Sequence, residues 1–289
     1  MTAPSTTVAA PVRRTLPFMR ALLMVFCALT ALAVGALFIL SDNTAETFAW
    51  TIKPSITAAF LGAGYAAGFV LVALSLRDPV WAHNRVPVLT IFVFVAVTLV
   101  ATLVHINKMH FDDDFGGLSF LAKAAAWFWL AVYVFVPVAM LVALFRQERA
   151  PGDDPPPEHP VPLLLRVALG IESAVLLLVG LMMFVDPTTA PLVWPWELTP
   201  FTGRVIAAWL IAFGLATALA AVAVDLERLR TAAIAYTTFG ALVLVTVARY
   251  TADFDWDDPP TWTLLVVTAA MTATGAVGWR LAPAPSSRA

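Results

Sequence analysis

The chain has 289 residues, of which 61% are hydrophobic and only 12% are charged, and its formal net charge is −2. A soluble domain carries about twice this share of charged residues, so the composition excludes an ordinary water-soluble protein. The near-neutral charge, with no basic cluster in the sequence, also excludes a nucleic-acid partner.

Eight apolar runs follow one another along the chain, each long enough to cross the roughly 30 Å hydrocarbon core of a bilayer as a helix. Backbone groups in hydrocarbon must be hydrogen-bonded within the segment, and no run alternates in polarity, so we predict helices and not a β-barrel. The predicted fold class is an all-α integral membrane protein with eight transmembrane helices. The runs are residues 21–40, 54–76, 86–104, 124–145, 167–185, 205–224, 231–248 and 259–279.

The second half of the chain repeats the first half with almost no gaps. Each half holds four runs, and because four is an even number, we predict two parallel four-helix repeats. The first run matches the fifth, which lies in mid-chain, and this favours a retained span over a signal peptide after Arg13 and Arg14. The matched pairs include Arg20 and Arg166, Trp50 and Trp196, Pro54 and Pro200, and Gly68 and Gly214 at an offset of 146, then Arg85 and Arg230, and Phe94 and Phe239, at an offset of 145.

Composition divides the chain into five parts. Residues 1–11 and 282–289 have the composition of disordered ends. Residues 12–150 and 162–281 are the first and second four-helix membrane modules. The proline-rich segment 151–161 between them is too polar for a membrane helix, and we predict that it is a semi-rigid linker.

Arginine and lysine are distributed unevenly between the two sides of the predicted bundle. Twelve of the 17 basic residues lie on the side of both termini and the linker, and five lie on the other side. Basic residues are held back on the cytoplasmic side during insertion, so both termini are predicted to be cytoplasmic. Arginine outnumbers lysine and alanine is abundant, as in many GC-rich bacterial genes, which favours a bacterial cell (plasma) membrane.

An acidic loop follows the third helix of each module on the predicted outer side. If the modules pack about a pseudo-two-fold axis, these loops approach each other, and their carboxylates suit a divalent cation with an imidazole as a further donor. The alternative is a pair of solvated loops whose acids pair locally with Lys108 and Arg249. The sequence leaves the identity of any metal open. The candidate ligands are His110, Asp112, Asp113, Asp114, Asp253, Asp255, Asp257 and Asp258.

Tryptophan and proline stand together before the second helix of each module. Indole rings favour the headgroup region and proline is favourable in the first turn of a helix, so we predict interfacial anchors at these helix starts. The alternative is an aromatic rim around an outer cavity. The anchors are Trp50 and Pro54 in the first module, and Trp194, Trp196 and Pro200 in the second.

Glu172 lies inside the fifth run, whereas the equivalent residue of the first module is Phe26. A charge near the bilayer centre costs about 3 kcal/mol, so this acid is a candidate for proton or ion handling. Since no basic residue lies at a similar depth in another run, we expect Glu172 to be protonated or to face water. The alternative is a structural hydrogen bond. Conceivable partners are Tyr133, Ser173, Tyr236 and Thr237.

Gly64 and Gly68 are four residues apart in the second run and permit close helix packing, either within the chain or in a homo- or hetero-oligomer. The single cysteine, Cys27, excludes an internal disulfide, and no motif indicates a cofactor. We therefore predict a multi-pass protein, surrounded by membrane lipid, that transports or senses a small solute, a proton or a divalent cation. The alternatives are a non-catalytic accessory or scaffold subunit of a membrane complex and, third, a metal-dependent lipid-modifying enzyme at the outer face.

Overall fold

Eight long helices build the protein, and they confirm the eight predicted spans. The structure is a computed structural model that describes residues 11–111 and 117–283. Within these ranges there is no β-sheet, only two isolated bridges. The length and apolar composition of the helices are those of a multi-pass membrane protein. The helices are α1 (Pro17–Val34), α3 (Ser55–Arg77), α4 (Trp81–Val104), α5 (Phe120–Glu148), α6 (Leu163–Val185), α7 (Pro200–Val222), α8 (Arg230–Arg249) and α9 (Pro259–Leu281).

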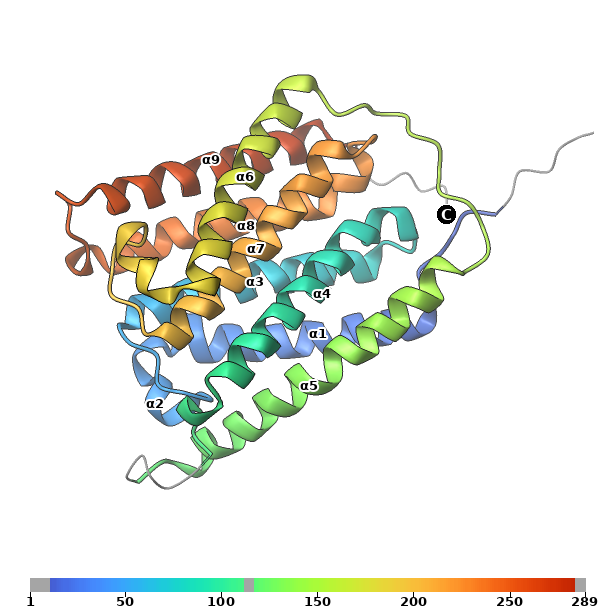
Figure 1. The fold of residues 1–289 in the computed structure, drawn as a ribbon. Coiled ribbons are helices and arrows are strands. Elements are labelled where there is room, and N and C mark those ends of the chain that lie inside the picture. Colours follow the sequence, from blue (N-terminus) through green and yellow to red (C-terminus); the bar gives the residue numbers. More distant parts are fainter. Residues whose placement is uncertain (1–10, 112–116, 284–289) are drawn as a thin grey trace, which may run out of the picture.

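The two most buried long helices, α3 and α7, lie in the middle of the bundle. Helix α3 packs against α1 and α8, and α7 packs against α6 and α4. Helix α4 also contacts α5, and α8 contacts α9. Figure 1 shows α1 and α5 along one edge of the bundle and α6 and α9 along the opposite edge. The outer helices therefore shield a central layer of four.

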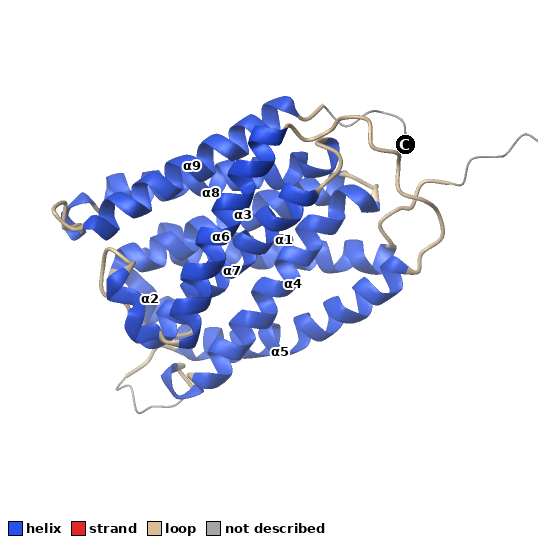
Figure 2. Ribbon diagram, turned by 45° about the horizontal axis from the view of Figure 1, so that its top comes forward, coloured by secondary structure: helices blue, strands red, loops and turns tan. Residues whose placement is uncertain are grey.

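Short helices fold over one end of the bundle, which we call the loop end. After α1 the chain continues into a π-helix, η1 (Gly35–Ile39), and then into η2 (Ser41–Asn43) and α2 (Thr44–Thr47). Figure 2 shows α2 beside the loops at this end. The helices α4, α6 and α8 also finish here, and each is followed by a short 3₁₀-helix: η3 (Ile106–Lys108), η5 (Pro187–Leu192) and η7 (Thr251–Asp253).

The opposite end, which we call the linker end, holds residues 149–162 and both ends of the described chain (Figure 1). The segment predicted to be a linker is bound to the rest of the protein. The backbone N–H of Arg13 donates to the carbonyl oxygen of Asp153 at 2.9 Å. Arg85 Nη1 lies 2.8 Å from Asp154 Oδ2. The linker therefore joins the N-terminal segment to the start of α4.

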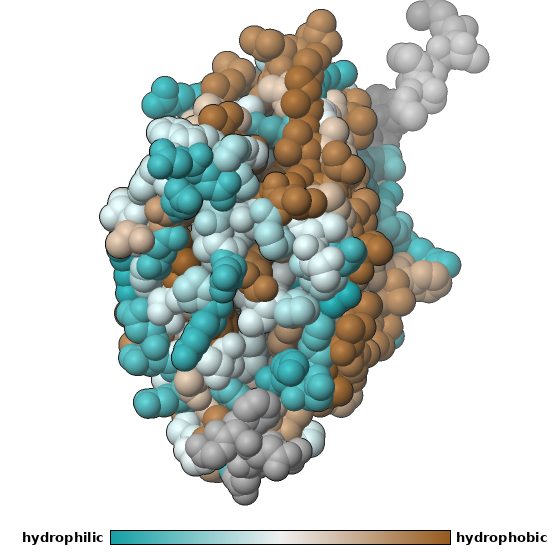
Figure 3. Space-filling model, turned by 60° about the vertical axis from the view of Figure 1, so that its left-hand side comes forward, coloured by the Kyte–Doolittle hydropathy of each residue, from teal (hydrophilic) through white to brown (hydrophobic). Residues whose placement is uncertain are grey.

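The flank of the bundle is apolar, whereas polar residues gather over the loop end (Figure 3). Large side chains on this flank are almost fully exposed: Phe120 is 87% exposed and Leu164 is 82% exposed. Water-soluble proteins rarely expose wide apolar surfaces. The flank is therefore the surface that contacts lipid.

Candidate functional site

A cavity of about 630 Å³ lies between α1, α3, α4 and α5, with part of its wall from α7. Small-molecule sites have volumes of roughly 300–1,000 Å³, so this cavity is large enough for a ligand. Leu32 on α1 and Leu121 and Phe128 on α5 line it, and each of these side chains is more than half exposed. The cavity therefore reaches the lipid-facing surface between α1 and α5.

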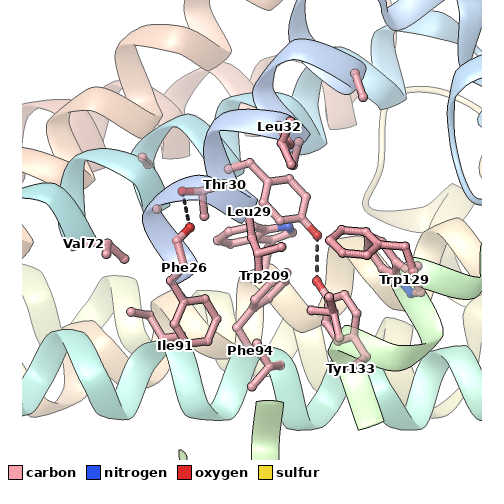
Figure 4. Close-up of a pocket in the computed structure, with 18 of the residues that line it drawn as sticks. Phe26, Leu29, Thr30, Leu32, Val72, Ile91, Phe94, Trp129, Tyr133 and Trp209 are labelled. Carbon is pink, nitrogen blue, oxygen red and sulfur yellow. Dashed lines mark hydrogen bonds between the residues drawn. The ribbon is translucent and has the colours of Figure 1, made fainter. Parts of the chain in front are cut away.

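Hydrocarbon side chains and aromatic rings form nearly the whole lining of the cavity. Figure 4 shows Phe26 and Leu29 of α1 and Ile91 and Phe94 of α4 around the same space. Among the described residues that line it, none has a charged side chain. Removing an ion from water into such surroundings costs several kcal/mol. The cavity is therefore suited to an apolar molecule and not to an ion.

Two tyrosine hydroxyl groups meet inside the cavity. Tyr65 on α3 and Tyr133 on α5 both line it, and their hydroxyl oxygens are 2.7 Å apart. Trp129 packs on the ring of Tyr133 at a centroid distance of 4.3 Å and donates from Nε1 to Thr102 Oγ1 at 3.1 Å. Figure 4 shows Tyr133 and Trp129 together on one side of the cavity. The two tyrosine hydroxyl groups of the lining thus lie together at one place, beside Trp129.

Trp209 brings α7 into the cavity wall. Its ring stacks on Phe94 with centroids 3.9 Å apart, and the ring of Tyr65 meets it edge-on at 5.3 Å. Gly64 makes room for this indole, because a Cβ atom at Gly64 would lie 2.9 Å from Cε2 of the tryptophan. Gly68 also faces this ring. Both glycines therefore face Trp209 within the chain.

The carboxyl group of Glu172 lies in the other half of the bundle, on α6, and the residue is 8% exposed. Tyr236 on α8 donates from its hydroxyl to Oε2 at 2.9 Å. Thr274 on α9 has its Oγ1 2.9 Å from Oε1 and 3.1 Å from Oε2. Tyr236 and Thr274 also line a second cavity of about 70 Å³. The acid is therefore held by two hydroxyl groups from two neighbouring helices.

Sequence reasoning named one of these two partners and missed the other. Tyr236 was among the conceivable partners of Glu172, but Thr274 was not, because a threonine in a membrane helix is a common packing residue. The other conceivable partners are hydrogen-bonded to groups other than Glu172. They are Tyr133, Ser173 and Thr237.

The three tryptophans that were predicted to be interfacial anchors are buried in protein. Trp50 is 2% exposed, Trp194 is 5% exposed and Trp196 is 9% exposed. Trp50 packs against Phe201 of α7 at a centroid distance of 4.6 Å, and Trp196 Nε1 donates to Thr57 Oγ1 of α3 at 2.8 Å. This placement corrects the expected contact with headgroups. The segments at the loop end fold back over the bundle, so each ring contacts side chains of the chain itself.

The prolines next to these tryptophans stand at helix starts. Pro200 is the first residue of α7, and the preceding Thr199 accepts a hydrogen bond from the backbone N–H of Thr202. Pro54 directly precedes Ser55, the first residue of α3. Proline lacks a backbone N–H, and the first turn of a helix leaves such groups unpaired in any case. The prolines therefore fix where these two buried helices begin.

His110 is 1% exposed, and both of its ring nitrogens have protein partners. Nδ1 lies 2.9 Å from the carbonyl oxygen of Phe48, and Nε2 lies 3.1 Å from Thr51 Oγ1. A carbonyl oxygen only accepts, so Nδ1 donates and Nε2 accepts from the hydroxyl group. The imidazole is thus already engaged, and it is not a free nitrogen donor for the predicted cation site. The neighbouring candidates Asp112, Asp113 and Asp114 lie outside the described residues.

The acids of the α8–α9 loop do not gather into a metal site in the described structure. Arg249 pairs with Asp42 at 3.5 Å, across the loop end, and not with Asp253 as the local-pairing alternative supposed. In the described ranges, the one group of acids and histidine close enough to hold a metal ion lies at the linker end and consists of His159, Asp225 and Glu227. The loop acids that are exposed or half-buried are Asp253, Asp255, Asp257 and Asp258.

Acidification is expected to destabilise the protein through His110. Burial lowers the pKa of His110 below its ordinary value of about 6.5. As the pH falls, the unfolded chain therefore binds a proton at this histidine before the folded protein does. The stability that the neutral His110 contributes is complete above about pH 6.5, and it is lost as the pH falls through the folded-state pKa. We expect the thermal unfolding midpoint in detergent to fall over this range.

The variant His110→Asn tests this expectation, because the asparagine amide can still donate to the Phe48 carbonyl group but does not titrate. Its unfolding midpoint should depend less on pH than that of the wild type. Some dependence should remain, since burial, Arg204 and Lys108 also lower the pKa of His105. An unchanged slope in the variant would show that His110 is not responsible.

Sequence reasoning missed the residues that shape the large cavity. Tyr65 and Trp209 lie within apolar runs that contain other aromatic residues, such as Phe60 and Phe213, and they resemble ordinary lipid-facing or core positions. One signal was present in the sequence: the chain has only four tyrosines, and three of them lie inside predicted runs. The hydroxyl groups of all three are hydrogen-bonded to polar side chains in the structure.

Comparison of the chain with protein-family models, with curated proteins and with solved structures found no match.

Proposed function

We propose that this membrane protein binds an apolar molecule that reaches it from the lipid, in the cavity between α1 and α5. The observation that carries this proposal is the cavity itself, about 630 Å³ in volume, with an uncharged and largely apolar lining that reaches the lipid-facing flank. The sequence led us to expect transport or sensing of a small solute. We keep that role in the proposal, but for a solute that is dissolved in the bilayer.

The duplication predicted from the sequence supports a specialised first half. Helices α1 and α3 pack together as α6 and α7 do, and α3 packs on α8 as α7 packs on α4, which is the pattern of a pseudo-two-fold axis. At the predicted offsets, Phe26 corresponds to Glu172, and Ile91 corresponds to Tyr236. The first member of each pair lines the large cavity, whereas the second members are hydrogen-bonded to each other. We infer that one repeat kept an open apolar site and the other acquired a polar contact.

We further propose that the linker end faces the cytoplasm of a bacterial cell and that the protein lies in the plasma membrane. The excess of basic residues at this end supports the orientation. The cavity is lined near the loop end by Thr47 and Leu121. In this orientation it opens toward the outer leaflet, so the ligand would enter from that side.

Glu172 favours a second function, the binding of a proton. Thr274 Oγ1 has one proton, and the carbonyl oxygen of Ala270 lies 3.0 Å away. A protonated Glu172 can donate to Thr274, which then donates to Ala270, while Tyr236 donates to the other carboxyl oxygen. Every group then has a partner without a buried charge. In the described structure, no lysine, arginine or histidine contacts this carboxyl group.

Filling the cavity tests the first proposal. Ala125 on α5 lines the cavity, and phenylalanine at this position would occupy part of it. Ala131 on the same helix is exposed and is not part of the lining, so Ala131→Phe is the matched control. The probe is a long-chain hydrocarbon with a diazirine group, incorporated into vesicles with the purified protein and photolysed.

Labelled peptides from α1 and α5, quantified by mass spectrometry, are the measurement. We expect strong labelling in the wild type and in Ala131→Phe. In Ala125→Phe we expect labelling to fall about fivefold or more, which corresponds to a loss of about 1 kcal/mol in binding. Thermal unfolding of each variant shows that it is folded. Equal labelling of the three proteins would contradict the proposal.

A further inference from the structure

The tyrosine pair is the polar feature of the cavity that can distinguish one apolar ligand from another. Tyr65 and Tyr133 come from α3 and α5, and both residues are at most 7% exposed. Their hydroxyl oxygens are 2.7 Å apart, and either can be the donor. Figure 4 draws this hydrogen bond as a dashed line at Tyr133, beside Trp129. The pair is thus placed to contact a molecule in the cavity.

Counting donors shows that the pair has a proton to spare. Two hydroxyl groups carry two protons, and their mutual hydrogen bond uses one of them. The structure gives neither hydroxyl group any other hydrogen bond within the described residues. A buried donor without an acceptor costs free energy, so we expect the second proton to have a hydrogen-bond acceptor.

The other polar side chains of the lining do not supply that partner, because in the described structure none of them is hydrogen-bonded to either tyrosine hydroxyl group. Thr30, Thr47 and Thr90 donate to backbone carbonyl oxygens four residues earlier in the chain, at 2.7, 2.9 and 2.8 Å. Trp129 donates to Thr102. Trp209 Nε1 has no acceptor in the described structure, but surrounding atoms cover it. The second proton of the tyrosine pair is therefore a hydroxyl donor of the lining that has no partner among the described residues.

We propose that the ligand has a hydrocarbon body and an uncharged oxygen acceptor, such as an ester or quinone carbonyl group, which accepts a hydrogen bond from this tyrosine pair. The inference rests on the proposed function, since it names the class of molecule that the same cavity takes. A charged headgroup does not suit the site, because none of the described residues that line it has a charged side chain. A molecule that moves from lipid into an apolar cavity gains little from the hydrophobic effect, so a hydrogen bond gives selectivity.

Matched probes test the role of the acceptor. A long-chain alkane, the methyl ester of the same chain length and a prenylated benzoquinone compete separately with the diazirine probe. The proteins are the wild type, Tyr65→Phe, Tyr133→Phe, the double variant and, as a control outside the cavity, Tyr250→Phe. Each affinity is compared between proteins in identical vesicles, so that differences in how the probes partition into lipid cancel.

The expected result is a loss only in the double variant. Each single variant keeps one hydroxyl group, whose proton is then free for the ligand, so binding of the ester and the quinone should be largely kept. The double variant should bind them about five- to tenfold more weakly, the effect of one hydrogen bond. Alkane binding should be the same in every variant. Whichever of the ester and the quinone binds the wild type more tightly identifies the source of the acceptor, an acyl lipid or an isoprenoid quinone.

The results that overturn this inference differ from those that overturn the proposed function. If the double variant binds the ester and the quinone as tightly as the wild type does, the tyrosine pair does not select the ligand, although the cavity still binds apolar molecules. If none of the three molecules competes and the probe itself labels Ala125→Phe as strongly as the wild type, the cavity is not a binding site.

Discussion

Alanine at Gly62 is expected to lower the free energy of unfolding by about 3 kcal/mol, because it overpacks the contact between η1 and α3. A Cβ atom there would lie 2.5 Å from the backbone nitrogen of Phe38 and 2.7 Å from its Cα. Phe38 belongs to the π-helix η1, and its carbonyl oxygen accepts a hydrogen bond from Arg249 Nη1 at 2.9 Å. The backbone is therefore held from the other side and cannot easily move away.

Gly170→Ala is the matched control for this substitution. Gly170 also lies within a long helix, but a Cβ atom there would have no neighbour within 4 Å. Alanine is the better helix former, so the control should unfold at the same free energy or slightly higher. Unfolding in mixed micelles, titrated with a denaturing detergent, measures both changes. Similar values for the two variants would show that the contact between η1 and α3 is looser than this structure indicates.

The eight spans could be predicted from the sequence because hydrocarbon imposes one simple requirement on the chain. A long apolar run must form a helix, since its backbone finds no other partner in lipid. The same uniformity conceals the cavity. Leu29, Ile91 and Val132 line it, but the sequence gives them the same apolar character as residues that face lipid. A cavity forms where the packed helices leave a space unfilled, and the position of that space depends on how the helices pack.

The site residues also divide into those that could be predicted from the sequence and those that depend on how the helices pack. Glu172 could be recognised because a single acid within an apolar run is costly. The pairing of Tyr65 with Tyr133 could not be recognised, because it joins residues 68 positions apart and depends on how α3 and α5 are placed around the cavity. Trp50 was assigned to the headgroup region from its place before a helix. In the structure the loop end folds over it and buries it between Phe48, Trp129 and Phe201.

The two candidate sites share a wall. Leu71, Thr90, Phe213 and Ala235 line both the large cavity and the small one. Phe213 also packs against the ring of Tyr236, with centroids 6.0 Å apart, and Tyr236 binds Glu172. A change in the contact between Tyr236 and Glu172 can therefore alter the shape of the large cavity, because a single layer of side chains separates the two. For this reason each Glu172 variant should also be assayed for probe labelling.

Leucine at Glu172 is expected to lower the free energy of unfolding by about 2 kcal/mol, because it leaves the hydroxyl group of Tyr236 buried without an acceptor. Thr274 is less affected, since its hydroxyl can donate to Ala270. Glu172→Gln keeps an acceptor oxygen and should be close to the wild type in stability. In a double-mutant cycle, Tyr236→Phe should cost about 1 kcal/mol less in the leucine background than in the wild type. Additive effects would show that the carboxyl group and the hydroxyl group are not coupled.

Whether Glu172 binds a proton is a separate question, which the glutamine variant answers because it keeps the shape of the site. At neutral pH the wild type should show the infrared carbonyl band of a protonated carboxyl group, and Glu172→Gln should lack it. Glu46 is exposed on α2, so Glu46→Gln should leave the band unchanged. If the wild type has no such band but Glu172→Leu is still destabilised, the acid is ionised and its role is to accept structural hydrogen bonds. The proton would then be excluded, and the apolar cavity would be the one functional site proposed for this chain.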